Sequence, residues 1–470
     1  MTLTQASAHP PAPTPPSAVR PRRRPSARIK NVPRRMLLLT GATMVALALF
    51  FGSLVAFASI AEEGLNIIGH ETGPQVVATA DLYFALSDMD AQIADVLLIG
   101  NERDPRKWSE DILATYDKSR EAAGLALLKS AKLAGNNQAE QEMVQSLLDG
   151  LGRYERLVSR AVLLDQREPH PAGPPHQQVI DLYRQATDLM QLELLPQAYN
   201  LTLESGTIVR HTYEERTLSL HSGWVLVLLS GIVVLGSLVW LQVFLTRRFR
   251  RVLNPALLIA TGIAAVYTLA GSVVLGHASN ALLAAKQDGF DSILTLARAR
   301  AVSNNMHGDQ TRYLLDPVRK DTYEQVYFDK AQSVLYAPAD NLAAYYTAIG
   351  KTDEAFLGFL GKESNAVRLP GQQAAVDELL AQYREFQQED RKLRAMSGAV
   401  NVRKDPLDKK FGDYDSALVK VAAMHRAAFD RAVDDGEARL HNLGFLLPAA
   451  VIGTAILIVV GIWPRFSEYR

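Results

Sequence analysis

The chain has 470 residues, 48% of them apolar, with 50 basic and 50 acidic side chains and a formal net charge of zero. That length exceeds one ordinary domain, and the balanced charge argues against a nucleic-acid-binding protein. Cysteine is absent, which excludes disulfide bonds and thiolate chemistry. The order of the residues carries more information than these totals, because the apolar residues collect in four long runs.

Residues 1–35 begin with a tract rich in Pro, Ala, Ser and Thr and end in a cluster of arginines and lysines. Such a segment buries little apolar surface, so we predict a disordered basic tail lying against the inner leaflet of a membrane. The first apolar run follows at 36–60. It is longer than the apolar part of a signal peptide, so we predict an uncleaved transmembrane helix.

Three further apolar runs are each long enough to cross the hydrocarbon core of a bilayer. They lie at residues 223–245, 255–276 and 443–463. The four runs contain no Asp, Glu, Lys, Arg or His, and transporters and channels usually place such groups at membrane depth. We therefore predict four transmembrane helices and disfavour a transport role.

A short hairpin, residues 246–254, joins the second and third of these runs. It contains four arginines, Arg247, Arg248, Arg250 and Arg251. Because cytoplasmic loops are enriched in Arg and Lys, we predict that the hairpin, the N-terminal tail and residues 464–470 are cytoplasmic. The hairpin is either a positively charged topology anchor alone or, in addition, the output surface for a cytoplasmic partner.

The remaining residues form two polar stretches, 61–222 and 277–442, which this topology places outside the cell membrane. We name them the first and the second polar segment. Apolar residues recur in both at alternating spacings of three and four, which is typical of helices in a bundle, and strand-like alternation is almost absent. The clearest such series are Leu82, Leu86, Met89, Ile93 and Val96; Val144, Leu147, Leu151, Tyr154, Val158 and Ala161; and Val376, Leu379, Tyr383, Phe386 and Leu393.

Interruptions in this periodicity predict the loops. In the first polar segment we expect breaks at Asn101–Pro105, Gly135–Asn137 and Pro169–Pro175, and a kink at Pro196. In the second we expect a break near His307 and Gly308, and the stretch 316–338 fits an extra turn or a shifted helix start. A constant offset relates Leu147, Leu151 and Tyr154 to Leu379, Tyr383 and Phe386. The predicted fold is therefore an all-α membrane protein with two extracytoplasmic four-helix bundles arranged as a tandem duplication.

Catalytic motifs are absent from the sequence. It contains no phosphate-binding glycine loop, no His-Glu-x-x-His and no nucleophile elbow. We therefore predict a protein that is not an enzyme and that has no catalytic residues, no cofactor and no metal site.

Histidines stand just outside each of the four runs, at His70, His221, His277 and His441. Imidazole titrates near neutral pH and binds zinc, so a ring that responds to pH or metal is one interpretation. The other interpretation, which we favour, is four polar residues at four membrane interfaces.

Charged side chains mark equivalent helices of the two polar segments. Asp81, Asp88 and Asp95 recur every seven residues, with Asp90 to one side. The second polar segment presents Arg298, Arg300, Asn304 and Asn305. Either the two segments pack against each other here, or they offer a mixed surface to a partner; we favour a third interpretation, a solvated face.

Three stretches resemble an actinobacterial family of four-span membrane proteins. They are Asp81–Ala91 (DLYFALSDMDA), Leu182–Met190 (LYRQATDLM) leading to Leu194–Ala198 (LLPQA), and Ala297–Arg300 (ARAR). Members of that family are thought to link a glutamate/glutamine-binding lipoprotein outside the cell to the soluble serine/threonine protein kinase G inside. More distantly, each polar segment is similar to the four-helix sensor domains of chemoreceptors and histidine kinases.

The resemblance implies a signal-relay component of the cell membrane, with a lipoprotein and a kinase as partners. The candidate residues for the outer partner are Asp81, Tyr83, Asp88, Asp90, Arg298, Arg300 and Asn304, and those for the inner partner are Arg247, Arg248, Arg250 and Arg251. A direct small-molecule sensor and a structural protein of the cell envelope are the alternatives. A homodimer is left open.

Overall fold

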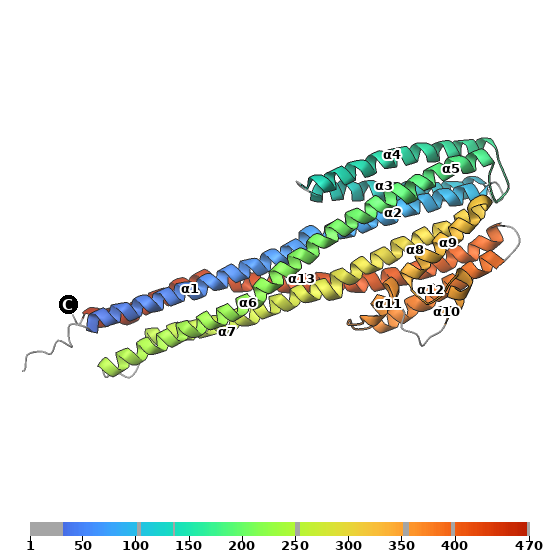
Figure 1. The fold of residues 1–470 in the computed structure, drawn as a ribbon. Helices are drawn as coiled ribbons and strands as arrows, with labels where there is room; N and C mark the ends of the chain where they lie inside the picture. Colours follow the sequence, from blue (N-terminus) through green and yellow to red (C-terminus); the bar gives the residue numbers. More distant parts are fainter. Residues whose placement is uncertain are drawn as a thin grey trace, which may run out of the picture. The chain divides into compact units, whose positions relative to one another are not determined.

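The computed structural model describes residues 32–100, 105–134, 137–249, 254–350, 357–395 and 400–467. Within these residues the secondary structure is helical, and the β-type pairing is an isolated antiparallel bridge between Tyr336 and Leu357. The α-helices are α1 (Val32–Asn66), α2 (Gly73–Ile99), α3 (Pro105–Ala134), α4 (Gln138–Arg167), α5 (Gln177–Leu189), α6 (Leu195–Phe249), α7 (Pro255–Ala284), α8 (Asp291–Leu315), α9 (Lys320–Val334), α10 (Leu342–Ala348), α11 (Gly358–Asn365), α12 (Gln372–Ala395) and α13 (Val400–Ser467) (Figure 1). The predicted all-α class is confirmed.

Four helical stretches in the described part of the chain are long and apolar enough to cross a membrane. They are Arg34–Ile99, Ser222–Arg247, Pro255–Leu315 and Leu407–Pro464. This agrees with the four predicted runs and is consistent with a multi-pass membrane protein. The orientation of the termini stays a prediction.

Two compact units make up the chain. One contains the described residues up to Phe50, Ser230–Ala265 and the described residues from Ala450 on, and the other contains Phe51–Leu229 and Val266–Ala449. In the first unit, the amide of Gln242 in α6 donates to the Thr261 hydroxyl at 2.7 Å and to the Leu257 carbonyl at 3.0 Å in α7. These bonds satisfy the most polar long side chain of the predicted spans without any charge.

Three π-helical segments interrupt the long helices. They are η1 (Ile67–Thr72), η2 (Met190–Leu194) and η3 (Ala285–Phe290). Segment η1 joins α1 to α2 and η3 joins α7 to α8, so a predicted span runs into the following helix of the second unit in the same way twice. Gly73 and Gly289 both lie against Phe429 of α13, where a Cβ would be 3.3 Å and 2.7 Å from its side chain.

The first polar segment follows the predicted boundaries closely. Helix α2 ends before Gly100, whose φ of 55° a residue with a side chain rarely adopts. Asn137 caps α4 by accepting a hydrogen bond from the Glu140 backbone, and α5 begins after the predicted 169–175 loop. At the predicted kink the helix continues: η2 ends at Leu194, and Pro196 is the second residue of α6, where a proline's missing N–H is tolerated. Residues 101–104, 135 and 136 lie outside the described residues.

The second polar segment departs from the prediction in two places. The break expected near His307 and Gly308 is wrong, because α8 runs through both residues. The His307 ring is buried and stacks on the Phe411 ring, with 4.2 Å between their centres, so this polar part of α8 packs against α13. The stretch 316–338 contains the short 3₁₀ helix η4 (Pro317–Arg319) and α9, and α10 and α11 precede α12.

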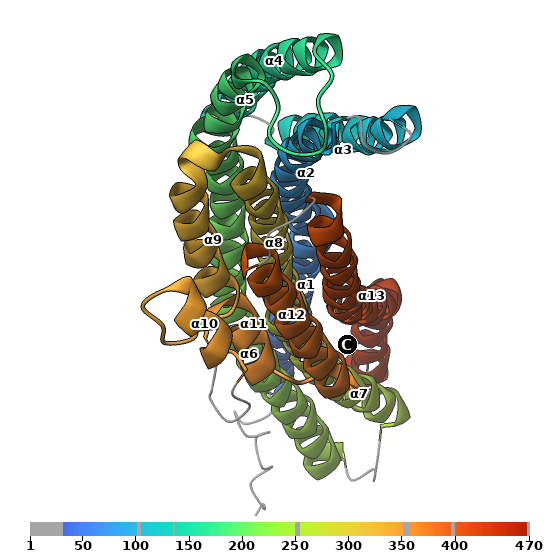
Figure 2. The same cartoon turned by 90° about the vertical axis from the view of Figure 1, so that its right-hand side faces the viewer.

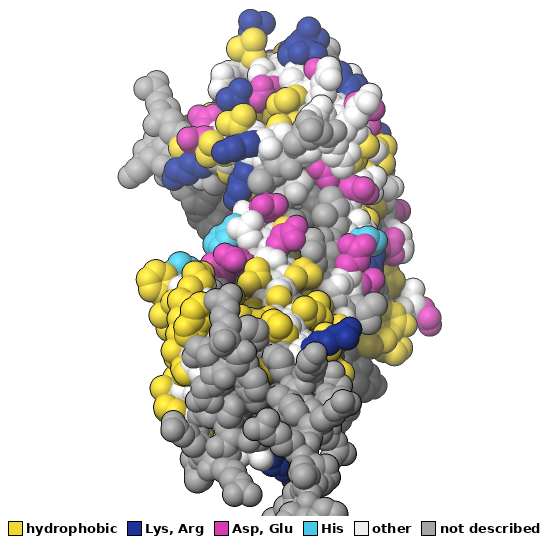
Figure 3. Space-filling model, turned by 90° about the vertical axis from the view of Figure 1, so that its left-hand side faces the viewer, with side chains coloured by type: hydrophobic (Ala, Val, Ile, Leu, Met, Phe, Trp, Pro, Cys, Tyr) yellow, Lys and Arg dark blue, Asp and Glu magenta, His cyan; other side chains and the backbone are white. Residues whose placement is uncertain are grey.

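The hydrophobic core of the second unit is continuous across both polar segments. It contains the predicted apolar series of α4 and α12 and, apart from the partly exposed Val96, that of α2. Tyr154, Tyr183, Tyr327 and Tyr383 are among its fully buried side chains. Helix α8 lies against α2 on one side and α9 on the other (Figure 2). On the face in Figure 3, hydrophobic side chains gather in one zone and most charged side chains in another.

Candidate functional site

The contact between α2 and α8 is close because it contains small residues. A Cβ on Gly308 of α8 would lie 3.3 Å from the Cβ of Ala91 in α2 and 3.0 Å from Nη2 of Arg312. Glycine at this position therefore leaves room both for the neighbouring helix and for a guanidinium group folded back along α8.

Arg312 lies at the centre of this contact and is completely buried. Its Nη2 donates to Asp90 Oδ2 at 2.6 Å, its Nη1 to Asp309 Oδ1 at 2.5 Å, and its Nε to the Tyr183 hydroxyl at 3.2 Å. Burial by itself would lower the pKa of Arg312, but Tyr183 and the two carboxylates outweigh it and raise that pKa well above its ordinary value. The buried guanidinium therefore stays charged.

Asp90 is the partner of this cation in the first polar segment, and it is also fully buried. Besides Arg312 it accepts hydrogen bonds from Thr187 at 2.7 Å, Tyr154 at 3.1 Å and Gln191 at 3.4 Å. A carboxylate with four donors has its lone pairs satisfied inside the protein. Asp90 thus joins the two polar segments, and in this structure it has no surface to offer the predicted outer partner.

The predicted solvated face of α2 and α8 is wrong for Asn304, Asp88 and Asp95, which form hydrogen bonds between the two helices. Asn304 donates to Ser87 at 3.0 Å and to Asp88 at 3.4 Å, and Thr311 donates to Asp95 at 2.7 Å. Burial raises the pKa of Asp88. Of the three interpretations of these charges, packing of the two polar segments against each other is the one that the structure shows.

The other predicted outer residues lie near this contact but on its margins. Arg300 makes a two-pronged ion pair with Asp415, at 2.7 and 2.9 Å, and its guanidinium lies 4.1 Å from the ring centre of Phe84. Arg298 lies 5.4 Å from the ring centre of Tyr199, and its buried Nε has no hydrogen-bond partner among the described residues.

Two further predicted outer residues differ in exposure. Asp81 is exposed, whereas Tyr83 is half-buried and has a pKa raised by burial. Of the predicted inner residues, Arg247 is exposed near the end of α6, and Arg248 belongs to α6 but its side chain is not described. Arg250 and Arg251 lie outside the described residues.

A cavity of about 600 Å³, which we call the junction cavity, opens where the two polar segments meet. Its lining comes from η2 and the adjoining parts of α5 and α6 on one side, and from α8, η4, α9 and α11 on the other. This volume falls in the range of small-molecule sites. Tyr83 is the one predicted outer site residue that lines it; the others with described side chains do not.

Charged pairs stand at the wall of the junction cavity. Arg319 Nη1 donates to Asp188 Oδ1 at 2.8 Å, and Lys330 Nζ donates to Asp309 Oδ2 at 2.5 Å. Burial is the largest influence on Lys330 and lowers its pKa. The Lys330–Asp309 pair connects to the Arg312 centre, since Asp309 contacts Arg312 as well.

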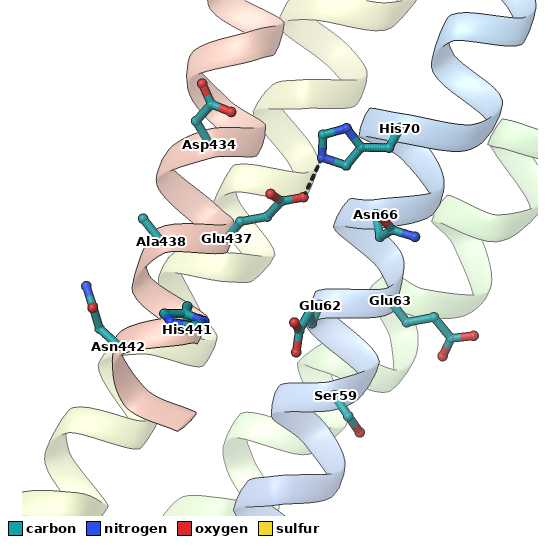
Figure 4. A pocket seen from close by; sticks show the side chains of 10 residues that line it. All are labelled: Ser59, Glu62, Glu63, Asn66, His70, Asp434, Glu437, Ala438, His441 and Asn442. Carbon is teal, nitrogen blue, oxygen red and sulfur yellow. Dashed lines mark hydrogen bonds and ion pairs between the residues drawn. The ribbon is translucent and has the colours of Figure 1, made fainter. Parts of the chain in front are cut away.

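A second hollow, the membrane-proximal groove, has a volume of about 810 Å³ and lies between α1–η1 and α13 (Figure 4). Its lining is acidic, and it contains His70 and His441, two of the four predicted interfacial histidines. His70 Nε2 lies 3.0 Å from Oε1 of Glu437. His277 is exposed and does not line the groove, and the side chain of His221 is not described. Among the described residues no cluster of three or more His, Asp or Glu is arranged to hold a metal ion.

Sequence reasoning missed the residues that do most at this contact, namely Arg312, Asp309, Arg319, Tyr323 and Lys330. One signal was present. The ten residues from Ser303 to Arg312 contain few apolar side chains, yet all ten are buried. A helix so polar is stable inside a protein only if its groups find partners there, and this could have pointed to Arg312.

Residues 64–214 match the model of the actinobacterial sensor domain. The match lies within the first polar segment. It supports the predicted relation to an actinobacterial sensor family and a sensor or signalling role. No curated protein and no solved structure matches the chain significantly.

Proposed function

We propose that this chain is a non-enzymatic relay of signals across the cell membrane. In this proposal the two polar segments are extracytoplasmic four-helix bundles that arose by tandem duplication. A change in how they pack is passed to the spans. Support comes from the sensor-domain match, from the four candidate spans, and from the parallel order of long helices α2, α3, α4, α5–α6 and α8, α9, α12, α13.

The observation that carries the proposal is the buried ion pair between Asp90 and Arg312. Each member lies on a helix that continues through a π-helical segment into a predicted span, α2 through η1 and α8 through η3. A signal that changes the packing of α2 on α8 therefore acts on two spans at once. A relay needs two packing states with different affinities for the partner, and π-helical segments often mark the places where helices adjust.

The partners in this proposal come from the family resemblance. They are an amino-acid-binding lipoprotein outside and a soluble serine/threonine kinase inside. Exposed Asp81 is available to the outer partner, and Arg247 with its neighbouring arginines to the inner one. Asp90 is removed from the outer surface, because its carboxylate is enclosed.

The test is crosslinking of the full chain in its native membrane, followed by identification of the captured proteins. We expect one substrate-binding lipoprotein and one kinase. A matched variant replaces Arg247, Arg248, Arg250 and Arg251 by lysine, which keeps the positive charge that sets topology but removes the planar guanidinium groups. We expect this variant to keep the lipoprotein and lose the kinase. Recovery of neither protein with the unchanged chain contradicts the proposal.

A second candidate function, direct sensing of a small molecule, is favoured by the junction cavity. A ligand there would touch both polar segments. The purified chain would then show ligand-dependent melting without any lipoprotein.

A further inference from the structure

The junction cavity has more unused hydrogen-bond donors than unused acceptors. The side chain of Arg319 donates one well-formed hydrogen bond, to Asp188, and its charge also acts on the neighbouring Tyr323 hydroxyl, whereas a guanidinium has five N–H groups. Lys330 likewise makes one, to Asp309. Asp309 is occupied by Arg312 and Lys330 together, so its oxygens are already engaged.

Tyr323 supplies an independent sign of a ligand. It lines the cavity, is 8% exposed, and has no hydrogen-bond partner for its hydroxyl among the described residues. A buried polar group without a partner costs free energy, and native proteins rarely leave one without a reason. Burial raises the pKa of Tyr323 to about 12, so the hydroxyl is a donor at neutral pH.

The start of α9 adds to the preference for an anion. Arg319 precedes the first residue of α9, and Thr322 and Tyr323 lie in its first turn. The N-terminus of a helix carries a partial positive charge and favours carboxylates and phosphates. Arg319, Thr322 and Tyr323 therefore present donors to the same space, and the positive charge comes from Arg319, because Asp321 in the same turn opposes the partial charge of the helix end.

Another part of the lining is apolar. Leu192, Leu195 and Pro196 contribute from the first polar segment, and Val302, Val326 and Phe359 from the second. A phosphate or sulfate alone would leave these surfaces in contact with water. An apolar body attached to the anionic group would cover them and gain the free energy of burial.

We propose that the junction cavity binds a small organic acid, with its carboxylate held by Arg319 and Tyr323 and its apolar body between η2 and α9. This inference rests on the second candidate function, direct sensing, and names the class of ligand. The bound acid contacts both polar segments, so it favours the arrangement in which they are closed on each other. Through η2 it also contacts the helix that runs on as α6 into the second predicted span.

The test uses matched acids and amides on the purified full chain in detergent. Phenylacetate and hexanoate are the probes, phenylacetamide and hexanamide are the uncharged controls, and phenylalanine is the zwitterionic comparison. We expect the acids to raise the unfolding midpoint in a saturable way and to bind at least tenfold more tightly than their amides. Equal affinity for an acid and its amide overturns the proposal, and so does the absence of any shift with the acids at millimolar concentration.

Variants locate the site. Arg319→Gln and Tyr323→Phe should each weaken phenylacetate binding, by about tenfold or more for the charged group and less for the hydroxyl. The controls are Arg391→Gln, an exposed arginine of α12, and Tyr336→Phe, a tyrosine that is 44% exposed. Unfolding midpoints without ligand show whether each variant is folded.

Asp188→Asn separates binding from mere support of the fold. It removes the carboxylate that competes for Arg319, so acid binding should be kept or become a few-fold tighter. If Asp188→Asn loses binding as Arg319→Gln does, the ion pair is structural and the proposal is overturned. Crosslinking to the lipoprotein and kinase is measured separately, so failure of the acids leaves the relay proposal to its own test.

Discussion

Asp90 of the first polar segment and Asp390 of the second are both completely buried among hydrogen-bond donors, but the two carboxylates are neutralised differently. In the second, Asp390 pairs with Arg394 of the same helix at 2.9 Å and accepts from Gln310 at 2.9 Å and from Tyr346. In the first, Asp90 receives its cation from Arg312, 222 residues away in the second segment. The charge of Asp390 is therefore neutralised within its own segment, whereas that of Asp90 is neutralised from the neighbouring segment. A second pair crosses in the other direction, since the buried Asp316 of the second segment accepts from Arg184 of the first at 2.6 Å.

This difference bears on the sensor-domain match, which covers residues of the first polar segment alone. Separated from α8, that segment would keep a buried carboxylate without its cation, and such a charge is strongly destabilising. The pair of polar segments, rather than the first alone, is consequently the unit that keeps this charge neutralised.

Breaking the shared ion pair should have the largest effect on stability. Arg312→Met leaves Asp90 and Asp309 without the guanidinium that both contact. We expect a loss of about 5 kcal/mol in the free energy of unfolding, the upper end for one partner of a buried pair. Thermal unfolding of the full chain in detergent measures it, and hydrogen exchange should show protection lost in both polar segments.

The matched control is Arg120→Met. Arg120 pairs with Glu155 at 2.5 Å within the first polar segment, and its side chain is 55% exposed. An exposed pair contributes about 1 kcal/mol or less. If the two variants lose similar stability, the buried contact is not what joins the segments.

Breaking the internal pair of the second polar segment should cost less and stay local. Arg394→Met deprives Asp390 of its cation, but Gln310 and Tyr346 still donate to that carboxylate. We expect a loss of about 3 kcal/mol. Hydrogen exchange should find the lost protection in α12 and its neighbours, while α3 and α4 keep theirs; loss spread over both segments would contradict the comparison.

Closing the gap between α2 and α8 should have a smaller effect. In Gly308→Ala the new methyl group meets Ala91 and Arg312 at 3.3 and 3.0 Å, so the helices or the guanidinium must shift. We expect a loss of about 1–3 kcal/mol from overpacking. Gly412→Ala in α13 is the control, because nothing lies within 4 Å of its Cβ and alanine is the better helix former. It should be neutral or stabilising in the same unfolding measurement.

The smallest expected effect is a pH dependence of the second polar segment. The buried His425 lies 2.5 Å from a Glu363 carboxylate oxygen and from the Asp288 carbonyl, so both of its nitrogens face acceptors. Burial opposes its charge, but these bonds prevail and raise its pKa above the ordinary 6.5. A histidine whose pKa is raised by folding stabilises the folded state. That contribution is fully present below its unfolded-state pKa of 6.5 and is lost as the pH rises through its folded-state pKa.

The unfolding midpoint should therefore fall as the pH is increased above 6.5, and His425→Gln should flatten that slope. His277→Gln, at an exposed position, is the control and should leave the slope unchanged. An unaltered slope in His425→Gln would show that another group is responsible.

Local patterns predicted the helices well, because burial on one side of a helix repeats in the sequence itself. The series from Val144 to Ala161 and from Val376 to Leu393 is buried as expected. The break at Gly308 was wrongly predicted because glycine serves helix contact there and does not end the helix. The pairing of Asp90 with Arg312 could not be predicted, since no local spacing connects residues so far apart. Helices α10 and α11 are too short to show a period.

The π-helical segments η1 and η3 have a mechanical consequence. A π-helical turn contains about one residue more than an α-helical turn, so the helix carries an inserted residue there without being broken. If the π-helical turn moves along the helix by one turn, the side chains between its old and new positions rotate about the helix axis by about 100° and shift along it by about 1.5 Å. Phe429 lies against Gly73, directly after η1, and against Gly289 within η3, so a shift of either π-helical segment would change its contact with the same side chain of α13.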